Sequence, residues 1–155
     1  MEFRIRGLDP SPFAPLFRME DARLARRRAL RCTADAKPGF PCRISLADAE
    51  PGASVLLVNY EHLPVDTPYR ASHAIYVSEG ASRFDAIGVV PQALRHRLVA
   101  LRAFDARGMM VDADIAEGSA LEPLIERFLR RDDVDYLQAH FARRGCFAAR
   151  IERAA

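Results

Sequence analysis

The last β-hairpin predicted from the sequence carries the side chains best suited to chemistry. A three-residue loop at residues 143–145 would place Gln138 opposite Arg150 on one face of the hairpin. His140 and Cys146 lie diagonally across the same predicted face, where side chains can approach one another. An imidazole beside a thiol can act as the base of a nucleophilic pair, so His140 and Cys146 are candidate catalytic residues.

The same groups also have structural interpretations. Isolated cysteines and histidines in sheets are usually packing or hydrogen-bonding residues. A metal site would need His62, His73 and His140 to converge with a cysteine or a carboxylate, and the sequence has no metal-ligand spacing that supports this. His73 shares a predicted strand face with Ile75 and Val77, which favours a buried, hydrogen-bonded histidine. We therefore predict no metal site.

An anion-binding pocket requires a less exact arrangement of side chains. The planar guanidinium of arginine can hold a carboxylate or a phosphate through two hydrogen bonds. We expect a small anionic molecule to bind in a polar pocket lined by Arg43, His62, Arg70, His73, Gln138, His140, Cys146 and Arg150. The structural alternative is that the arginines pair with acids such as Asp35, Glu61 and Asp66. Convergence of the predicted residues in one concave site would favour the pocket.

Several function classes lack support in the sequence. The chain has no P-loop, no G-x-G-x-x-G fingerprint and no H-E-x-x-H helix, and nothing else in it indicates a cofactor. A net charge of +2, from 23 basic and 21 acidic residues, is too small for a dedicated nucleic-acid binder. The rival to a ligand-binding protein or enzyme is an interaction module that uses a sheet edge or an arginine-rich helix. That helix and its flanks contain Arg18, Arg23, Arg26, Arg27, Arg28 and Arg31, for which a solvated face is the simpler interpretation.

The cysteines and the N-terminus bear on the compartment. Three cysteines, at positions 32, 42 and 146, form neither an even disulfide framework nor a C-x-x-C pair. The first six residues alternate polar and apolar side chains and do not resemble a signal peptide, and no apolar run is long enough to span a bilayer. We expect a cytoplasmic protein without a membrane segment.

Hydrophobic periodicity predicts a single α+β domain over 155 residues, half of them hydrophobic. The expected core is a twisted, mainly antiparallel sheet, with curling towards a barrel as an open alternative. Helices are predicted at 19–28, after Pro91 and at 119–131, the last with a capping box that begins at Ser119. The predicted strands are 3–6, 30–34, 42–46, 55–60, 69–77, 98–104, 109–115, 136–141 and 146–152.

The two last hairpins have predictable strand pairing. A loop of residues 106–108 with Gly108 in the left-handed conformation places Arg102 opposite Asp112, while Phe104 faces Met110. In the final hairpin the same argument pairs three sets of apolar residues, namely Phe141 with Phe147, Ala139 with Ala149 and Leu137 with Ile151. An exposed hairpin edge is compatible with a homodimer.

Five separated segments in this order resemble the bacterial family of domain of unknown function 1203, over nearly the whole chain. The resemblance implies a compact, stand-alone bacterial protein with no assigned activity, so it transfers no functional residue. The segments are Asp35-Ala-Lys-Pro-Gly-Phe-Pro-Cys-Arg43, Leu57-Val-Asn-Tyr-Glu-His62, Pro68-Tyr-Arg-Ala-Ser-His73, Gly108-Met-Met-Val-Asp-Ala-Asp114 and Ala139-His-Phe-Ala-Arg-Arg-Gly-Cys146.

Overall fold

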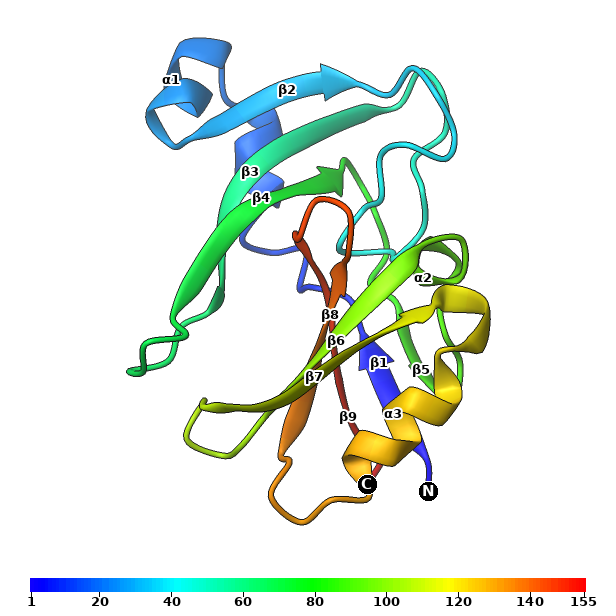
Figure 1. The fold of residues 1–155 in the computed structure, drawn as a ribbon. Helices are drawn as coiled ribbons and strands as arrows, with labels where there is room; N and C mark the ends of the chain where they lie inside the picture. The colour runs from blue at the N-terminus through cyan, green and yellow to red at the C-terminus, as the bar shows by residue number, and fades with distance from the viewer.

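The computed structural model describes residues 1–155 and contains two antiparallel sheets with few helices (Figure 1). The larger sheet has six strands in the order β5-β1-β9-β8-β6-β7, and the smaller has the order β2-β3-β4. Neither sheet closes into a barrel, and the predicted α+β class is confirmed. The strands are β1 (Phe3–Arg6), β2 (Ala29–Thr33), β3 (Ser54–Leu63), β4 (Ala71–Ser78), β5 (Asp85–Ile87), β6 (Leu98–Phe104), β7 (Met110–Glu117), β8 (Tyr136–Phe141) and β9 (Phe147–Arg153).

The main core lies between the six-stranded sheet and helix α3 (Glu122–Leu129). Leu124, Ile125, Phe128 and Leu129 are buried, as the predicted helical stripe requires. The helix is shorter than the predicted 119–131, because Gly118–Ala120 forms a separate 3-10 turn (η2) and no side chain caps α3. The predicted capping box is therefore wrong. None of the helices is long and apolar enough to cross a membrane.

A second core lies against the three-stranded sheet. Leu56 and Val58 of β3 pack there with Leu24 of α1 (Asp21–Arg26), and the 3-10 turn η1 (Ala14–Arg18) precedes this helix. The predicted strand at 42–46 is wrong, because this segment turns sharply and makes only isolated bridges on either side of the turn. Cys42 is buried, as predicted. The turn delivers Arg43 to the space between the two sheets.

The β6–β7 hairpin confirms the loop conformation but not the whole register. Gly108 is left-handed, with a φ of 85°, and Phe104 faces Met110. A β-bulge after Ala103 inserts one extra residue in β7, so Arg102 faces Ala113 and not Asp112. All pairs beyond the bulge are shifted by one residue from the prediction.

A second β-bulge changes the functional interpretation of the β8–β9 hairpin. Gln138 faces Arg150 and Ala139 faces Ala149, as predicted, but the next pair is His140 with Phe147. Ala148 has no partner in β8, so the residues that precede it in β9 point to the opposite face from the one predicted. Cys146 therefore shares the Phe141 face of the hairpin, and the predicted pairing of Phe141 with Phe147 is wrong.

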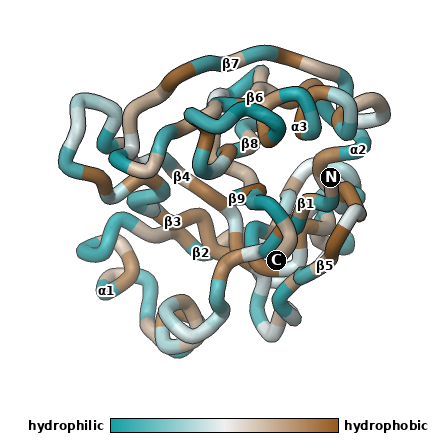
Figure 2. The backbone as a smooth tube through the Cα atoms, turned by 90° about the horizontal axis from the view of Figure 1, so that it is seen from below, coloured by the Kyte–Doolittle hydropathy of each residue, from teal (hydrophilic) through white to brown (hydrophobic).

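Strand β7 forms one outer edge of the six-stranded sheet and runs along the rim of the molecule (Figure 2). Two of its backbone N–H groups, at Ala113 and Ile115, donate to the side chain of the preceding aspartate, Asp112 or Asp114, at 2.8 Å. These two donors are therefore already occupied within the chain, while a homodimer through an exposed hairpin edge stays an untested expectation.

Candidate functional site

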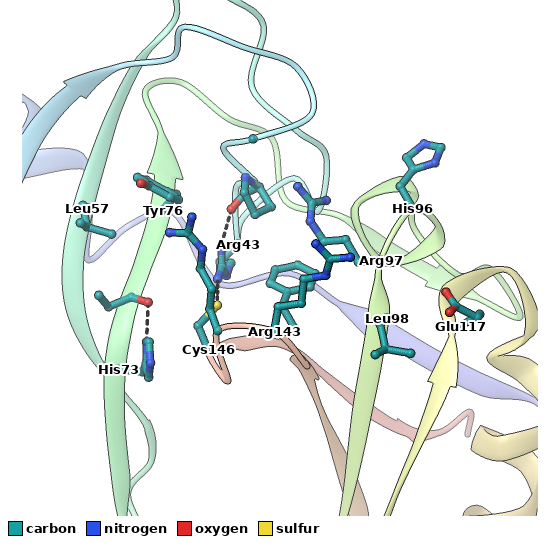
Figure 3. A pocket seen from close by; sticks show the side chains of 15 residues that line it. Arg43, Leu57, His73, Tyr76, His96, Arg97, Leu98, Glu117, Arg143 and Cys146 are labelled. Atoms are coloured by element: carbon teal, nitrogen blue, oxygen red, sulfur yellow. Dashed lines mark hydrogen bonds between the residues drawn. The ribbon is translucent and has the colours of Figure 1, made fainter.

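The principal pocket has a volume of about 620 Å³ and opens between the two sheets, where the β8–β9 turn reaches up beside β4 (Figures 1 and 3). Its walls come from β3 and β4, from the turn around Arg43, from the start of β6 after helix α2 (Gln92–Arg95), and from the β8–β9 turn. Fifteen residues line it, among them four arginines and a single carboxylate, Glu117. The pocket is therefore strongly positive for a chain with nearly balanced charge.

Arg43 is the anchor of this site, because its side chain is only 2% exposed yet has no carboxylate partner. Its Nε donates to the carbonyl oxygen of Phe147 at 2.7 Å, and its Nη1 donates to that of Pro41 at 2.5 Å. Its Nη2 donates to Cys146 Sγ at 3.1 Å. Burial lowers the pKa of Arg43 to about 10, so the group stays cationic at neutral pH. The fold buries this positive charge without a carboxylate beside it.

Phe141 connects Arg43 with a second arginine. The guanidinium carbons of Arg43 and Arg97 lie 4.8 and 5.0 Å from the centre of the Phe141 ring, within the range of cation–π attraction. Arg97 also donates to both carboxylate oxygens of Asp48, at 2.6 and 2.9 Å. Burial alone would raise the pKa of Asp48, but hydrogen bonds from Arg97 and from the Gly39 N–H outweigh it and hold the pKa below its usual value. Asp48 thus neutralises Arg97.

Arg143 and Arg144 occupy the β8–β9 turn and are exposed. Figure 3 shows Arg143 extending towards Arg97 across the mouth of the pocket. Neither turn arginine makes an ion pair or a side-chain hydrogen bond within the chain. Because Gly145 adopts a φ of 76°, the chain reverses tightly and keeps both arginines beside the pocket. With Arg43, they supply positive charge that no carboxylate of this protein neutralises.

The structure separates Cys146 from its predicted partner. Cys146 is 7% exposed and lines the pocket beside Arg43, whereas His140 is fully buried on the opposite face of the hairpin. The bulge at Ala148 causes this separation. The structure therefore does not bring the candidate nucleophilic pair of His140 and Cys146 together.

His140 belongs to a separate cluster with His62 and Gln138. Gln138 Nε2 donates to the backbone oxygen of His62 at 2.7 Å, and Gln138 Oε1 accepts from His62 Nδ1 at 2.8 Å. His140 donates from Nδ1 to the Gly145 carbonyl oxygen at 3.0 Å, and its Nε2 lies 3.2 Å from Gln138 Oε1. The cluster satisfies most of its own hydrogen bonds and lies outside the pocket.

Burial keeps both histidines of this cluster neutral. It lowers the pKa of His140 to about 3, although the Gly145 carbonyl opposes the shift, and nearby Arg102 lowers the value further. Burial also lowers the pKa of His62, against the opposing effect of the Gln138 hydrogen bond. The ring of Phe147 stacks on His62 with 5.3 Å between ring centres. These are properties of a packed core.

The remaining predicted residues divide between the pocket and the surface. His73 lines the pocket wall and is only half-buried, so it is not the buried histidine that the apolar alternation indicated. Arg70 pairs with Glu61 at 3.1 Å, which matches the structural alternative. Arg150 pairs with Glu152 at 3.2 Å and lies over the Tyr136 ring. Of the eight predicted pocket residues, the structure brings together Arg43, His73 and Cys146.

Three arginines of the pocket were missing from the sequence-based candidates. The alternation pattern assigns Arg143 and Arg144 only to a hairpin loop, although two adjacent arginines at a tight turn are visible in the sequence. Arg97, between a short helix and a strand, carries no distinguishing local signal. No group of three or more His, Cys, Asp or Glu side chains is arranged to hold a metal ion.

Comparisons with known proteins identify a family but no activity. No curated protein and no solved structure matches the chain. A family model described as "Protein of unknown function (DUF1203)" matches residues 39–153, a segment that includes every wall of the pocket and the histidine cluster. Because this match covers most of the chain, the protein belongs to the DUF1203 family.

Proposed function

We propose that this protein binds a small anionic molecule in the pocket between its two sheets. The observation that carries the proposal is the set of arginines at the pocket whose charge no carboxylate of the chain neutralises, namely Arg43, Arg143 and Arg144. Elsewhere in the molecule ten of the other eighteen arginines are paired with acids, as Arg4 is with Asp85 and Arg131 with Asp112 and Asp133. A carboxylate or phosphate in the pocket would supply the missing counter-charge.

The size of the pocket supports a ligand and not a simple packing defect. A volume of about 620 Å³ falls in the range of small-molecule sites, about 300 to 1,000 Å³. Arg43 is held rigidly by its carbonyl and thiol acceptors, so its charge is fixed in position before any ligand arrives. Such preorganisation reduces the entropic cost of binding.

Thermal unfolding with a panel of phosphate- and carboxylate-bearing small molecules tests this proposal, with sodium chloride at equal ionic strength as the reference. A ligand that binds the folded state raises the melting temperature. The test variant is the double substitution Arg143→Ala with Arg144→Ala. Its matched control is Arg26→Ala with Arg27→Ala, which removes two adjacent arginines without salt bridges at the end of α1.

We expect at least one anion to raise the melting temperature of the wild type and of the α1 control, and to do so much less for the turn variant. If no anion exceeds the chloride reference, or if the turn variant responds like the wild type, the proposal is wrong. Loss of the response only in the α1 control would instead place the anion on the arginine-rich helix.

A further inference from the structure

The wall of the pocket that carries no charge is large and apolar. Leu57 of β3 and Leu98 of β6 are both half-buried, and they line the pocket from opposite sheets. Figure 3 shows them on either side of the arginine-bearing centre, with Tyr76 next to Leu57. Ala74 extends the wall along β4, and the Phe141 ring forms part of the lining between the sheets. An inorganic anion would leave all of this surface in contact with water.

From this arrangement we infer that the ligand is an amphipathic organic anion, a phosphate ester or carboxylate with a hydrophobic body. This inference rests on the proposed anion-binding function and names the class of its ligand. The anionic group lies among Arg43, Arg143 and Arg144, and the hydrophobic body covers Leu57 and Leu98. Burying apolar surface on both partners adds affinity that the charge alone does not provide.

The volume of the pocket supports the same class. Bare phosphate or sulfate would occupy only a small part of the pocket volume of about 620 Å³ and would leave the rest of the pocket to water. A ligand with an aromatic or branched aliphatic body fills the space between β3 and β6. Leu57 and Leu98 then act as specificity residues, which distinguish an organic anion from phosphate itself.

The surface around Leu57 provides a matched control position. Leu30 of β2 pairs directly with Leu57 in the three-stranded sheet and is 59% exposed, but it does not line the pocket. Leu57→Ser and Leu30→Ser therefore make the same chemical change on adjacent strands. Only the first removes apolar surface from the proposed site.

The test measures binding of three probes that separate charge from hydrophobic body: 1-naphthyl phosphate, inorganic phosphate and 1-naphthol. The chain contains no tryptophan, so naphthyl fluorescence reports binding with little interference from the protein. We expect 1-naphthyl phosphate to bind at least about tenfold more tightly than either other probe. Inorganic phosphate is measured by its competition with 1-naphthyl phosphate.

The variants locate the two halves of the ligand. Leu57→Ser should weaken 1-naphthyl phosphate binding by about fivefold and leave phosphate unchanged, whereas Leu30→Ser should change neither. If phosphate binds as tightly as 1-naphthyl phosphate, anion binding stands and the amphipathic ligand is wrong. If 1-naphthol binds as tightly as 1-naphthyl phosphate, or if no probe binds, the anion-binding function is wrong as well.

Discussion

Two polar regions meet at the β8–β9 hairpin, and they differ in how their hydrogen-bonding and charged groups are satisfied. In the histidine cluster, the Gln138 side chain donates to the His62 backbone oxygen and accepts from the His62 ring nitrogen Nδ1. His140 donates to a backbone carbonyl. In the pocket, Arg43 is held by two carbonyl oxygens and the Cys146 sulfur, and the turn arginines have no partner. The first region satisfies most of its hydrogen bonds within the chain. The second lacks a counter-charge, which is why we place the ligand there.

Arg43→Met should have the largest effect on stability. It leaves the buried carbonyl oxygens of Pro41 and Phe147 without a donor, and we expect a loss of about 3 to 5 kcal/mol in the free energy of unfolding. Denaturant titration measures this loss. Arg150→Met is the control, because that arginine is half exposed and makes only a surface ion pair with Glu152 and a contact with the Tyr136 ring, so its loss should stay at about 1 kcal/mol. Equal losses would contradict the anchoring role of Arg43.

The histidine cluster should respond to acid. His140 has a pKa of about 3 in the folded protein, whereas an unfolded histidine titrates near 6.5, so below pH 6.5 the unfolded state binds more protons. Stability should therefore be complete above pH 6.5 and fall as the pH decreases towards 3, by about 3 kcal/mol between pH 7 and pH 4. Unfolding titrations at several pH values measure the slope.

The control for this acid response is His140→Asn, whose amide can donate to the Gly145 carbonyl but does not titrate. Carboxylates titrate in both proteins, so the difference between the two slopes belongs to His140. An unchanged slope in the variant would show that the ring is already charged in the folded state.

Gln138→Leu should destabilise the protein without affecting the pocket. The substitution keeps a similar volume but leaves the ring Nδ1–H and the backbone carbonyl oxygen of His62 without these partners, at a cost of about 2 kcal/mol in the free energy of unfolding. Binding of 1-naphthyl phosphate at a temperature where the variant is folded should match that of the wild type. Weaker binding would mean that the two regions are coupled, and their separation as described would be wrong.

Arg143→Ala should have the opposite profile. The side chain is exposed and unpaired, so the free energy of unfolding should change by less than about 0.5 kcal/mol. Binding of 1-naphthyl phosphate at low salt should weaken by about fivefold, and high salt should reduce the difference between variant and wild type. Arg27→Ala is the matched control, and an equal effect of that substitution on affinity would indicate attraction by overall charge alone.

Much of the strand order along the chain was predictable, but the decisive register was not. Alternation identified the hairpin partners Gln138 and Arg150, and Gly108 and Gly145 were correctly placed in tight turns. The bulge at Ala148 has no local signal, because an alanine fits either face of a strand. Its consequence, the stacking of Phe147 on the His62 ring, depends on a strand residue 85 positions earlier in the chain.

The candidate site shows the same limit. Arg43, His73 and Cys146 were selected from residue type, but their convergence requires the turn at 42–46, which alternation misidentified as a strand. The structural alternative predicts ion pairs for Arg70 and Arg150, and both depend on contacts that are local in the folded sheet. An arginine stays unpaired only if no acid lies near it in the folded protein. The unpaired arginines can therefore be identified only from the three-dimensional structure.

The aspartates along β7 also affect how copies of this chain could assemble. An open-ended filament built by extending the six-stranded sheet needs a free edge on both sides of every subunit. Asp112 and Asp114 occupy two donors on the β7 side, and the other side ends in β5, a strand of three residues. A filament that grew in this way would have few continuous backbone hydrogen bonds between neighbouring subunits.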